Sequence, residues 1–133
     1  MRTKIKLRGS DIMTLMILAL AAFYDPDLEN PDCIQLPFDA RTGELIDERW
    51  QQWLRWDPVQ MAEEHVDNLK KLKCLFFDCG SRDQYRLHHG ARILAQRFED
   101  LGVPYRYEEF DDDHSSIQYR YDVSLPLLAD TLS

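Results

Sequence analysis

Two side chains in the C-terminal half of the chain could act together as an acid–base pair. Asp83 ends the loop Gly80-Ser81-Arg82-Asp83, after one apolar segment, and His114 follows Asp111-Asp112-Asp113, after a second apolar segment. A carboxylate beside an imidazole fixes the ring tautomer and stabilises the imidazolium, so the histidine can serve as a general base. Asp78 is a rival for the acid, although it can equally close the strand that it ends. The alternative for both residues is an ordinary solvated loop position.

The segments around this pair predict a strand, a helix and a second strand. Residues 73–78 form a short apolar run, as in a buried strand. Residues 84–101 carry apolar side chains at helical spacing, and Gly102 provides a helix stop. Residues 105–110 predict the second strand. The two strands of such a βαβ unit are parallel, and reactive groups gather beyond their carboxyl ends, which is where Asp83 and His114 would lie.

The remainder of the chain is predicted to be helical around one long loop. We expect helices over residues 11–24, 45–56, 57–72 and 115–132, with a proline-containing loop over 25–43. The fold class is therefore α/β, in a single domain made of a helical insert (1–72) and a βαβ unit with a C-terminal helix (73–133). Because a two-stranded parallel sheet is marginal alone, the unit is expected to be the end of a larger sheet.

The N-terminal segment is open to two interpretations. Four basic residues (Arg2, Lys4, Lys6 and Arg8) precede the apolar run 12–23, which is similar to a secretory signal peptide. The run is too short to span a bilayer, and Ser10-Asp11 fits the start of a helix. We expect a buried helix here, with removal of residues 1–22 as the alternative.

Composition excludes several function classes. The chain has 133 residues, a formal net charge of −8 and three cysteines. The negative charge argues against a nucleic-acid partner, and cysteines without a CxxC motif predict neither a disulfide framework nor a zinc site. A metal site could be built from the acids at 108, 109 and 111–113 with His114, but the spacing matches no EF-hand loop and favours a solvated acidic turn. We expect a cytoplasmic protein that needs no cofactor or metal and binds no membrane.

Two other groups could contribute to a site. Trp50, Trp53 and Trp56 could line an acyl pocket, although packing of a helix is the favoured interpretation of such an aromatic stripe. Cys79 lies next to the proposed pair, but no base is placed in the sequence to activate its thiol.

Short sequence segments along the chain resemble a known family. They are Ala21-Ala22-Phe23-Tyr24-Asp25-Pro26-Asp27, Leu36-Pro37-Phe38-Asp39, Thr42-Gly43-Glu44-Leu45 and Trp53-Leu54-Arg55-Trp56-Asp57-Pro58-Val59. Together with the order of strand, Asp loop, helix, strand and His turn, they resemble the C-terminal portion of α/β-hydrolase serine esterases akin to esterase D and enterochelin esterase. The segment Phe110-Asp111-Asp112-Asp113-His114 is similar to their histidine turn, with acids where glycines are common.

The resemblance implies a catalytic triad in the chain order Ser, Asp, His, with Asp83 as the acid and His114 as the base. The nucleophile does not map, since the sequence has no Gly-x-Ser-x-Gly, and the oxyanion hole depends on the same missing segment. The implied function is the C-terminal fragment of a hydrolase of small-molecule carboxylic esters that is inactive alone. The alternative is a stand-alone pseudoenzyme or interaction module whose exposed sheet edge is covered by a partner or by a second copy.

Overall fold

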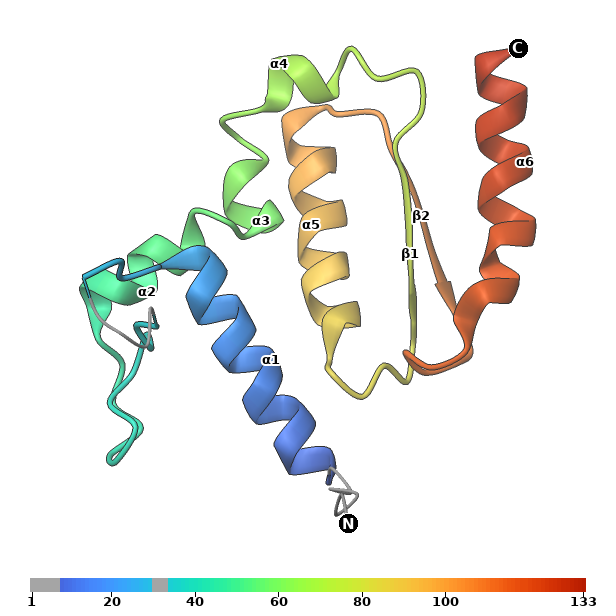
Figure 1. Ribbon diagram of the computed structural model, residues 1–133. Coiled ribbons are helices and arrows are strands. Elements are labelled where there is room, and N and C mark those ends of the chain that lie inside the picture. Colours follow the sequence, from blue (N-terminus) through green and yellow to red (C-terminus); the bar gives the residue numbers. More distant parts are fainter. Residues whose placement is uncertain (1–7, 30–33) are drawn as a thin grey trace. The chain divides into compact units, whose positions relative to one another are not determined.

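The computed structural model describes residues 8–29 and 34–133, and it divides the chain into two compact units, Met1–Asp57 and Pro58–Ser133. Figure 1 labels the helices and strands of both. Three of the basic residues in the signal-like segment (Arg2, Lys4 and Lys6) lie outside the described residues, as does Cys33. None of the described helices is both long and apolar enough to cross a membrane.

The first unit contains α1 (Gly9–Tyr24) and α2 (Asp47–Leu54). Helix α1 starts slightly earlier than predicted, because the Asp11 carboxylate accepts a hydrogen bond from the Arg8 backbone N–H at 2.7 Å and caps the first turn. The expected helix forms, but most of its apolar side chains are exposed or only half-buried. Leu15 is 52 % exposed, and Ala21 is the one residue of α1 that is buried.

The tryptophan stripe serves packing within this unit. The Tyr24 ring, at the end of α1, stacks on Trp56 with centroids 5.9 Å apart and meets Trp53 edge-on at 5.3 Å. Trp50 lies beside Trp53, with centroids 6.4 Å apart. Aromatic pairs in these geometries stabilise a contact beyond the apolar area they bury. The favoured interpretation, helix packing, therefore accounts for the stripe.

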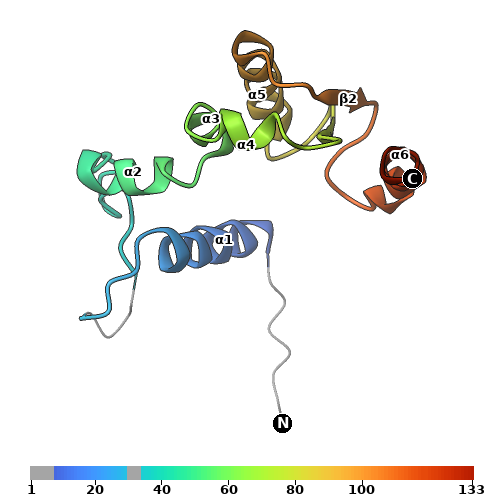
Figure 2. The ribbon, with the colours of Figure 1, turned by 90° about the horizontal axis from the view of Figure 1, so that it is seen from above.

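The second unit is a mixed α/β structure. It contains α3 (Pro58–Met61), α4 (Val66–Leu69), β1 (Phe76–Gly80), α5 (Leu87–Leu101), β2 (Arg106–Phe110), the 3₁₀ turn η1 (Ile117–Arg120) and α6 (Tyr121–Leu132). The strands are parallel, with register running from Phe76 opposite Arg106 to Gly80 opposite Phe110. The βαβ unit thus has the predicted order and parallel strands, but β1 lies at Phe76–Gly80, further along the chain than the predicted residues 73–78. Figures 1 and 2 show the strand pair between α5 and α6.

The helix expected over residues 57–72 is wrong as a continuous element. It is broken into α3 and α4 by a turn. Ala62 is buried beside Phe98 of α5, and Val66 and Leu69 pack on the same cluster. Isolated helices of this length are marginal, so packing against α5 decides the local conformation over helix propensity.

The core of the second unit lies between α5 and one face of the strands. Phe98 is 5 % exposed and meets Phe77 of β1 edge-to-face, with ring centroids 6.0 Å apart. Phe77 also stacks on Tyr107, its register partner in β2, at 4.9 Å. Alternate residues of a strand share a face, so Cys79 lies on this same side, while Asp78 lies on the other. The core thus fixes which strand residues face α5.

Truncation of the central ring tests this packing. We expect Phe98→Ala to lower the free energy of unfolding by about 3–5 kcal/mol, because it removes buried contacts and leaves a cavity. The matched control is Ile93→Ala on the same helix, since Ile93 is 54 % exposed and its loss should cost less than about 1 kcal/mol. Urea unfolding followed by circular dichroism measures both. Equal losses in the two variants would contradict this assignment of the core.

Candidate functional site: an aspartate–histidine pair beyond the strand ends

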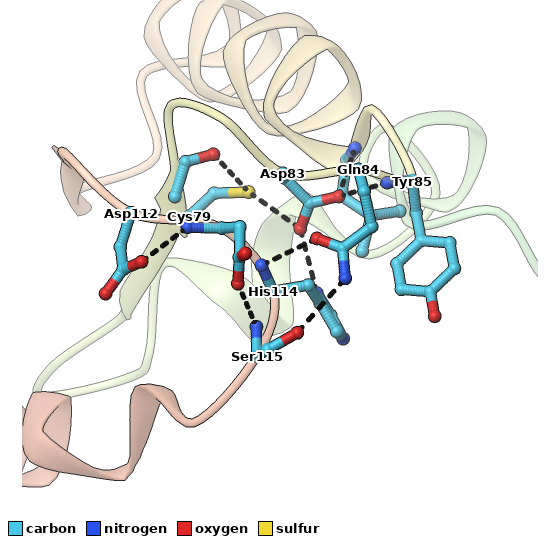
Figure 3. A network of polar contacts seen from close by, with 10 residues as sticks. Cys79, Asp83, Gln84, Tyr85, Asp112, His114 and Ser115 are labelled. Atoms are coloured by element: carbon cyan, nitrogen blue, oxygen red, sulfur yellow. Dashed lines mark hydrogen bonds and ion pairs between the residues drawn. The ribbon is translucent and has the colours of Figure 1, made fainter.

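Asp83 and His114 are in direct contact. Asp83 Oδ2 and His114 Nδ1 are 2.8 Å apart, although the residues are separated by 31 positions in the chain (Figure 3). Asp83 comes from the loop between β1 and α5, and His114 from the loop between β2 and η1. The two predicted site residues are therefore brought together beyond the carboxyl ends of two neighbouring parallel strands.

Asp83 is a buried carboxylate with its oxygens satisfied. The residue is 2 % exposed, and it is the largest side chain that the second unit buries fully among the described residues. Oδ1 accepts hydrogen bonds from the backbone N–H groups of Tyr85, at 2.8 Å, and Leu87, at 3.4 Å. Oδ2 faces His114. A buried charge is tolerated when it is bonded in this way, so the position differs from a solvated loop acid.

The same contacts keep Asp83 ionised. Burial alone would raise the pKa of Asp83, but the hydrogen bond to His114 and the backbone N–H groups of Leu87 and Tyr85 outweigh it and hold the pKa below its usual value. At neutral pH the group is a carboxylate, which accepts a hydrogen bond from the protonated Nδ1 of His114. This is the state that orients an imidazole for general-base work.

Asp83 also determines where α5 begins. In a helix that began at Gln84, the Leu87 N–H would bond the Asp83 carbonyl; it lies 3.4 Å from the Asp83 carboxylate instead, and Arg86 adopts a left-handed conformation with φ of +63°. Aspartate commonly competes with helical hydrogen bonding in this manner. The helix therefore starts at Leu87, three residues later than predicted, and the intervening turn presents Asp83 toward His114.

Backbone contacts join the two site loops. The Ser81 N–H donates to the Phe110 carbonyl at 2.8 Å, and the Arg82 N–H donates to the Asp112 carbonyl at 3.0 Å. A Cβ built on Gly80 would lie 2.4 Å from the Asp112 carbonyl oxygen and 2.7 Å from that of Asp113. Gly80 is therefore required for the histidine turn to approach. The sequence marked Gly80 only as the end of a strand, although a glycine at that place is a recognised sign of close backbone approach.

His114 is open on its other side. Its side chain is 46 % exposed, and the ring meets the Tyr85 ring edge-on with centroids 5.1 Å apart. Within residues 8–29 and 34–133, no protein group is hydrogen-bonded to Nε2. The nitrogen opposite the Asp83 contact is thus free to accept a proton from a reacting group. Tyr85, which sequence reasoning did not single out, limits how the ring can turn.

Asp78 does not serve the histidine. It lies on the opposite face of the strands, where Arg120 Nε donates to Asp78 Oδ2 at 2.7 Å and Arg120 Nη2 donates to Glu108 Oε2 at 2.7 Å. Asp78 and Glu108 are register partners, so one guanidinium bonds both, and Arg106 also pairs with Glu108. The guanidinium also lies over the Phe110 ring, 4.6 Å from its centroid. The rival acid therefore belongs to a contact that ties η1 to the sheet.

Cys79 is a neighbour of the pair and not a nucleophile. Its thiol is 3.9 Å from Asp83 Oδ2 and is buried. Burial raises the pKa of Cys79, and the negative charge of Asp83 raises it further. A thiol becomes nucleophilic when its pKa falls, so these surroundings oppose reactivity.

The acidic turn before His114 is held by protein partners. Asp111 pairs with Arg82, Asp112 accepts from the Tyr119 hydroxyl at 3.0 Å, and Asp113 accepts from the Ser115 N–H. Among the described residues, no group of three or more His, Cys, Asp or Glu side chains is arranged to hold a metal ion. The turn is a structural support for the histidine loop.

A scan against protein-family models finds no match to this chain, and neither does a search of curated proteins.

The close approach at Gly80 gives a testable consequence. We expect Gly80→Ala to lower the free energy of unfolding by about 1–3 kcal/mol, because the added methyl group meets backbone oxygens that cannot rotate away. Since the histidine turn must move to accommodate it, the variant should also weaken the contact between Asp83 and His114. Thermal or urea unfolding measures the stability.

Gly90 provides the matched control. It lies inside α5, and a Cβ built on it meets nothing within 4 Å. Gly90→Ala should therefore raise stability by about 0.5–1 kcal/mol, the usual gain for this change in a helix. If both variants shifted stability in the same direction by the same amount, the close approach would not be the controlling feature at Gly80.

Proposed function

We propose that this chain carries the acid and the base of a serine carboxylesterase, with Asp83 as the acid and His114 as the base. The observation that supports the proposal most is the contact of 2.8 Å between a buried carboxylate and an imidazole from two separate loops. Both loops follow parallel strands, which is the usual position of reactive groups in α/β sheets. The resemblance to α/β-hydrolase esterases includes the loops of the pair and also segments outside them, such as residues 53–59.

The proposed reaction is hydrolysis of small-molecule carboxylic esters through an acyl-enzyme. A serine Oγ, supplied by a segment outside these 133 residues, attacks the ester carbonyl while His114 Nε2 accepts its proton. The imidazolium, stabilised by Asp83, then gives that proton to the departing alcohol. In the second half, His114 takes a proton from water as the water attacks the acyl group, and the imidazolium then returns that proton to the serine Oγ as the carboxylic acid leaves.

This proposal assigns little activity to the chain alone. Without the serine, His114 can only assist the attack of water on an ester, and general-base help of that kind is worth about 10²–10⁴-fold. The stabilisation of the tetrahedral intermediate by an oxyanion hole would also be missing. In this proposal the chain therefore supplies one part of an active site, and the serine and oxyanion hole come from another segment.

The DNA upstream of the Met1 codon, read in all frames, provides the first part of the test. We expect it to encode a strand, a Gly-x-Ser-x-Gly turn and a helix. Co-expression of that segment with this chain should give hydrolysis of p-nitrophenyl acetate. His114→Gln should then lower kcat by about 10⁴-fold or more, as loss of one triad member does.

Two controls make this test specific. His65→Gln changes a histidine in the turn between α3 and α4 and should leave the rate unchanged. A Ser→Ala change in the upstream turn should match the loss from His114→Gln, since triad members act as a unit. Hydrolysis that survives His114→Gln unchanged, or an upstream region with no such segment, would contradict the proposal.

An interaction module is the second candidate, and the small size of the sheet favours it. The described residues form a sheet of two strands only, which leaves strand edges without a further strand, and such edges readily pair with another chain. In that case His114→Gln should leave partner binding intact. The effect of this one substitution therefore separates an esterase part from an interaction module.

A further inference from the structure

Gln84 joins the loop of the acid to the loop of the base. It is the residue after Asp83, and its Oε1 accepts a hydrogen bond from the His114 backbone N–H at 2.9 Å. Its Nε2 donates to the Ser115 hydroxyl at 3.2 Å. One amide side chain thus spans 30 positions of the chain and holds two consecutive residues of the histidine loop (Figure 3).

The contact holds the main chain that carries a ring with few protein contacts of its own. The His114 side chain is 46 % exposed, and its protein contacts are the Asp83 carboxylate on Nδ1 and the edge of the Tyr85 ring. An exposed side chain with few contacts keeps much of its rotamer freedom. The direction from the His114 backbone to Asp83 therefore depends on where the main chain of the loop is held.

The backbone contacts between the loops do not reach the main chain of His114. The backbone bonds from Ser81 and Arg82 reach Phe110 and Asp112, and the close approach of Gly80 involves Asp112 and Asp113. The Gln84 amide alone, among the described residues, bonds to the main chain of His114 itself. Its two hydrogen bonds thus extend the contact between the loops to His114 and Ser115.

We propose that Gln84 is a positioning residue. Its bonds to the His114 N–H and the Ser115 hydroxyl hold the His114 imidazole where Nδ1 meets the Asp83 carboxylate. Because Gln84 neighbours Asp83 in the chain, these bonds tie the backbone of the base to the loop of the acid. A catalytic role for this positioning rests on the proposed function. The positioning of the imidazole does not rest on it, because it concerns only the geometry of Asp83 and His114.

The tautomer of the neutral His114 ring, read by ¹⁵N nuclear magnetic resonance, tests the proposal directly. With Gln84 present, the hydrogen bond to Asp83 should place the proton on Nδ1. Gln84→Leu removes both hydrogen bonds at similar side-chain size and should turn the single Nδ1–H form into a mixture of the two tautomers. The His114 amide should also exchange its hydrogen about fivefold faster, the effect of losing roughly 1 kcal/mol of hydrogen bonding.

Two further variants separate positioning from a general structural effect. Gln84→Glu keeps oxygen acceptors at the same distance and should preserve the Nδ1–H tautomer of His114. Gln96→Leu removes an exposed glutamine that bonds Asp100 on α5 and should leave both readings unchanged. Gln84 is exposed, so circular dichroism should show that all three variants fold.

A wild-type tautomer and amide exchange rate in Gln84→Leu would overturn the proposal, as would an equal change in Gln96→Leu. This outcome is distinct from failure of the esterase proposal, because the measurement reads the ring and needs no ester hydrolysis. An active esterase with an unaltered tautomer in Gln84→Leu would refute the role of Gln84 alone.

Discussion

A carboxylate buried among apolar and backbone atoms must have its charge neutralised or its oxygens bonded, and Asp83 meets this requirement in a way that organises the site. Oδ1 accepts hydrogen bonds from two backbone N–H groups, and Oδ2 contacts the His114 ring. An unpaired charge at 2 % exposure would cost several kcal/mol. The contacts that satisfy the Asp83 carboxylate lie in the turn before α5 and in the histidine loop, so they connect these two segments.

The parallel strand pair makes the contact possible at low cost. Register between β1 and β2 ends at Gly80 opposite Phe110, so the two following loops leave the sheet side by side. Gly80 lets the backbones approach, and Gln84 ties them beyond the last strand bond. On the far face, Arg120 bonds the two acids that share a register position, and Arg106 also pairs with Glu108. The acids of this region thus have separate tasks: Asp78 and Glu108 attach η1, while Asp83 serves the histidine.

The elements with strong periodic patterns were predictable from the sequence. The apolar spacing over residues 84–101 and the two short apolar runs sufficed for the βαβ unit, and the strand ends located Asp83 and His114. The broken helix between residues 57 and 72 was not predictable, since packing on Phe98 decides it. Gln84 was missed because an exposed amide carries no periodic signal, and its two bonds connect residues far apart in the chain.

The protonation state of the His114 ring tests the central claim most directly. If Asp83 orients the base, ¹⁵N resonance should show the neutral ring protonated on Nδ1, leaving Nε2 free. In Asp83→Asn, the amide oxygen should keep the Tyr85 and Leu87 N–H groups, so the amide N–H₂ faces His114 and the ring must move its proton to Nε2. A reversal of tautomer between the two proteins is the predicted result. The same tautomer in both would contradict the account, because Asp83 would then have no control over the histidine.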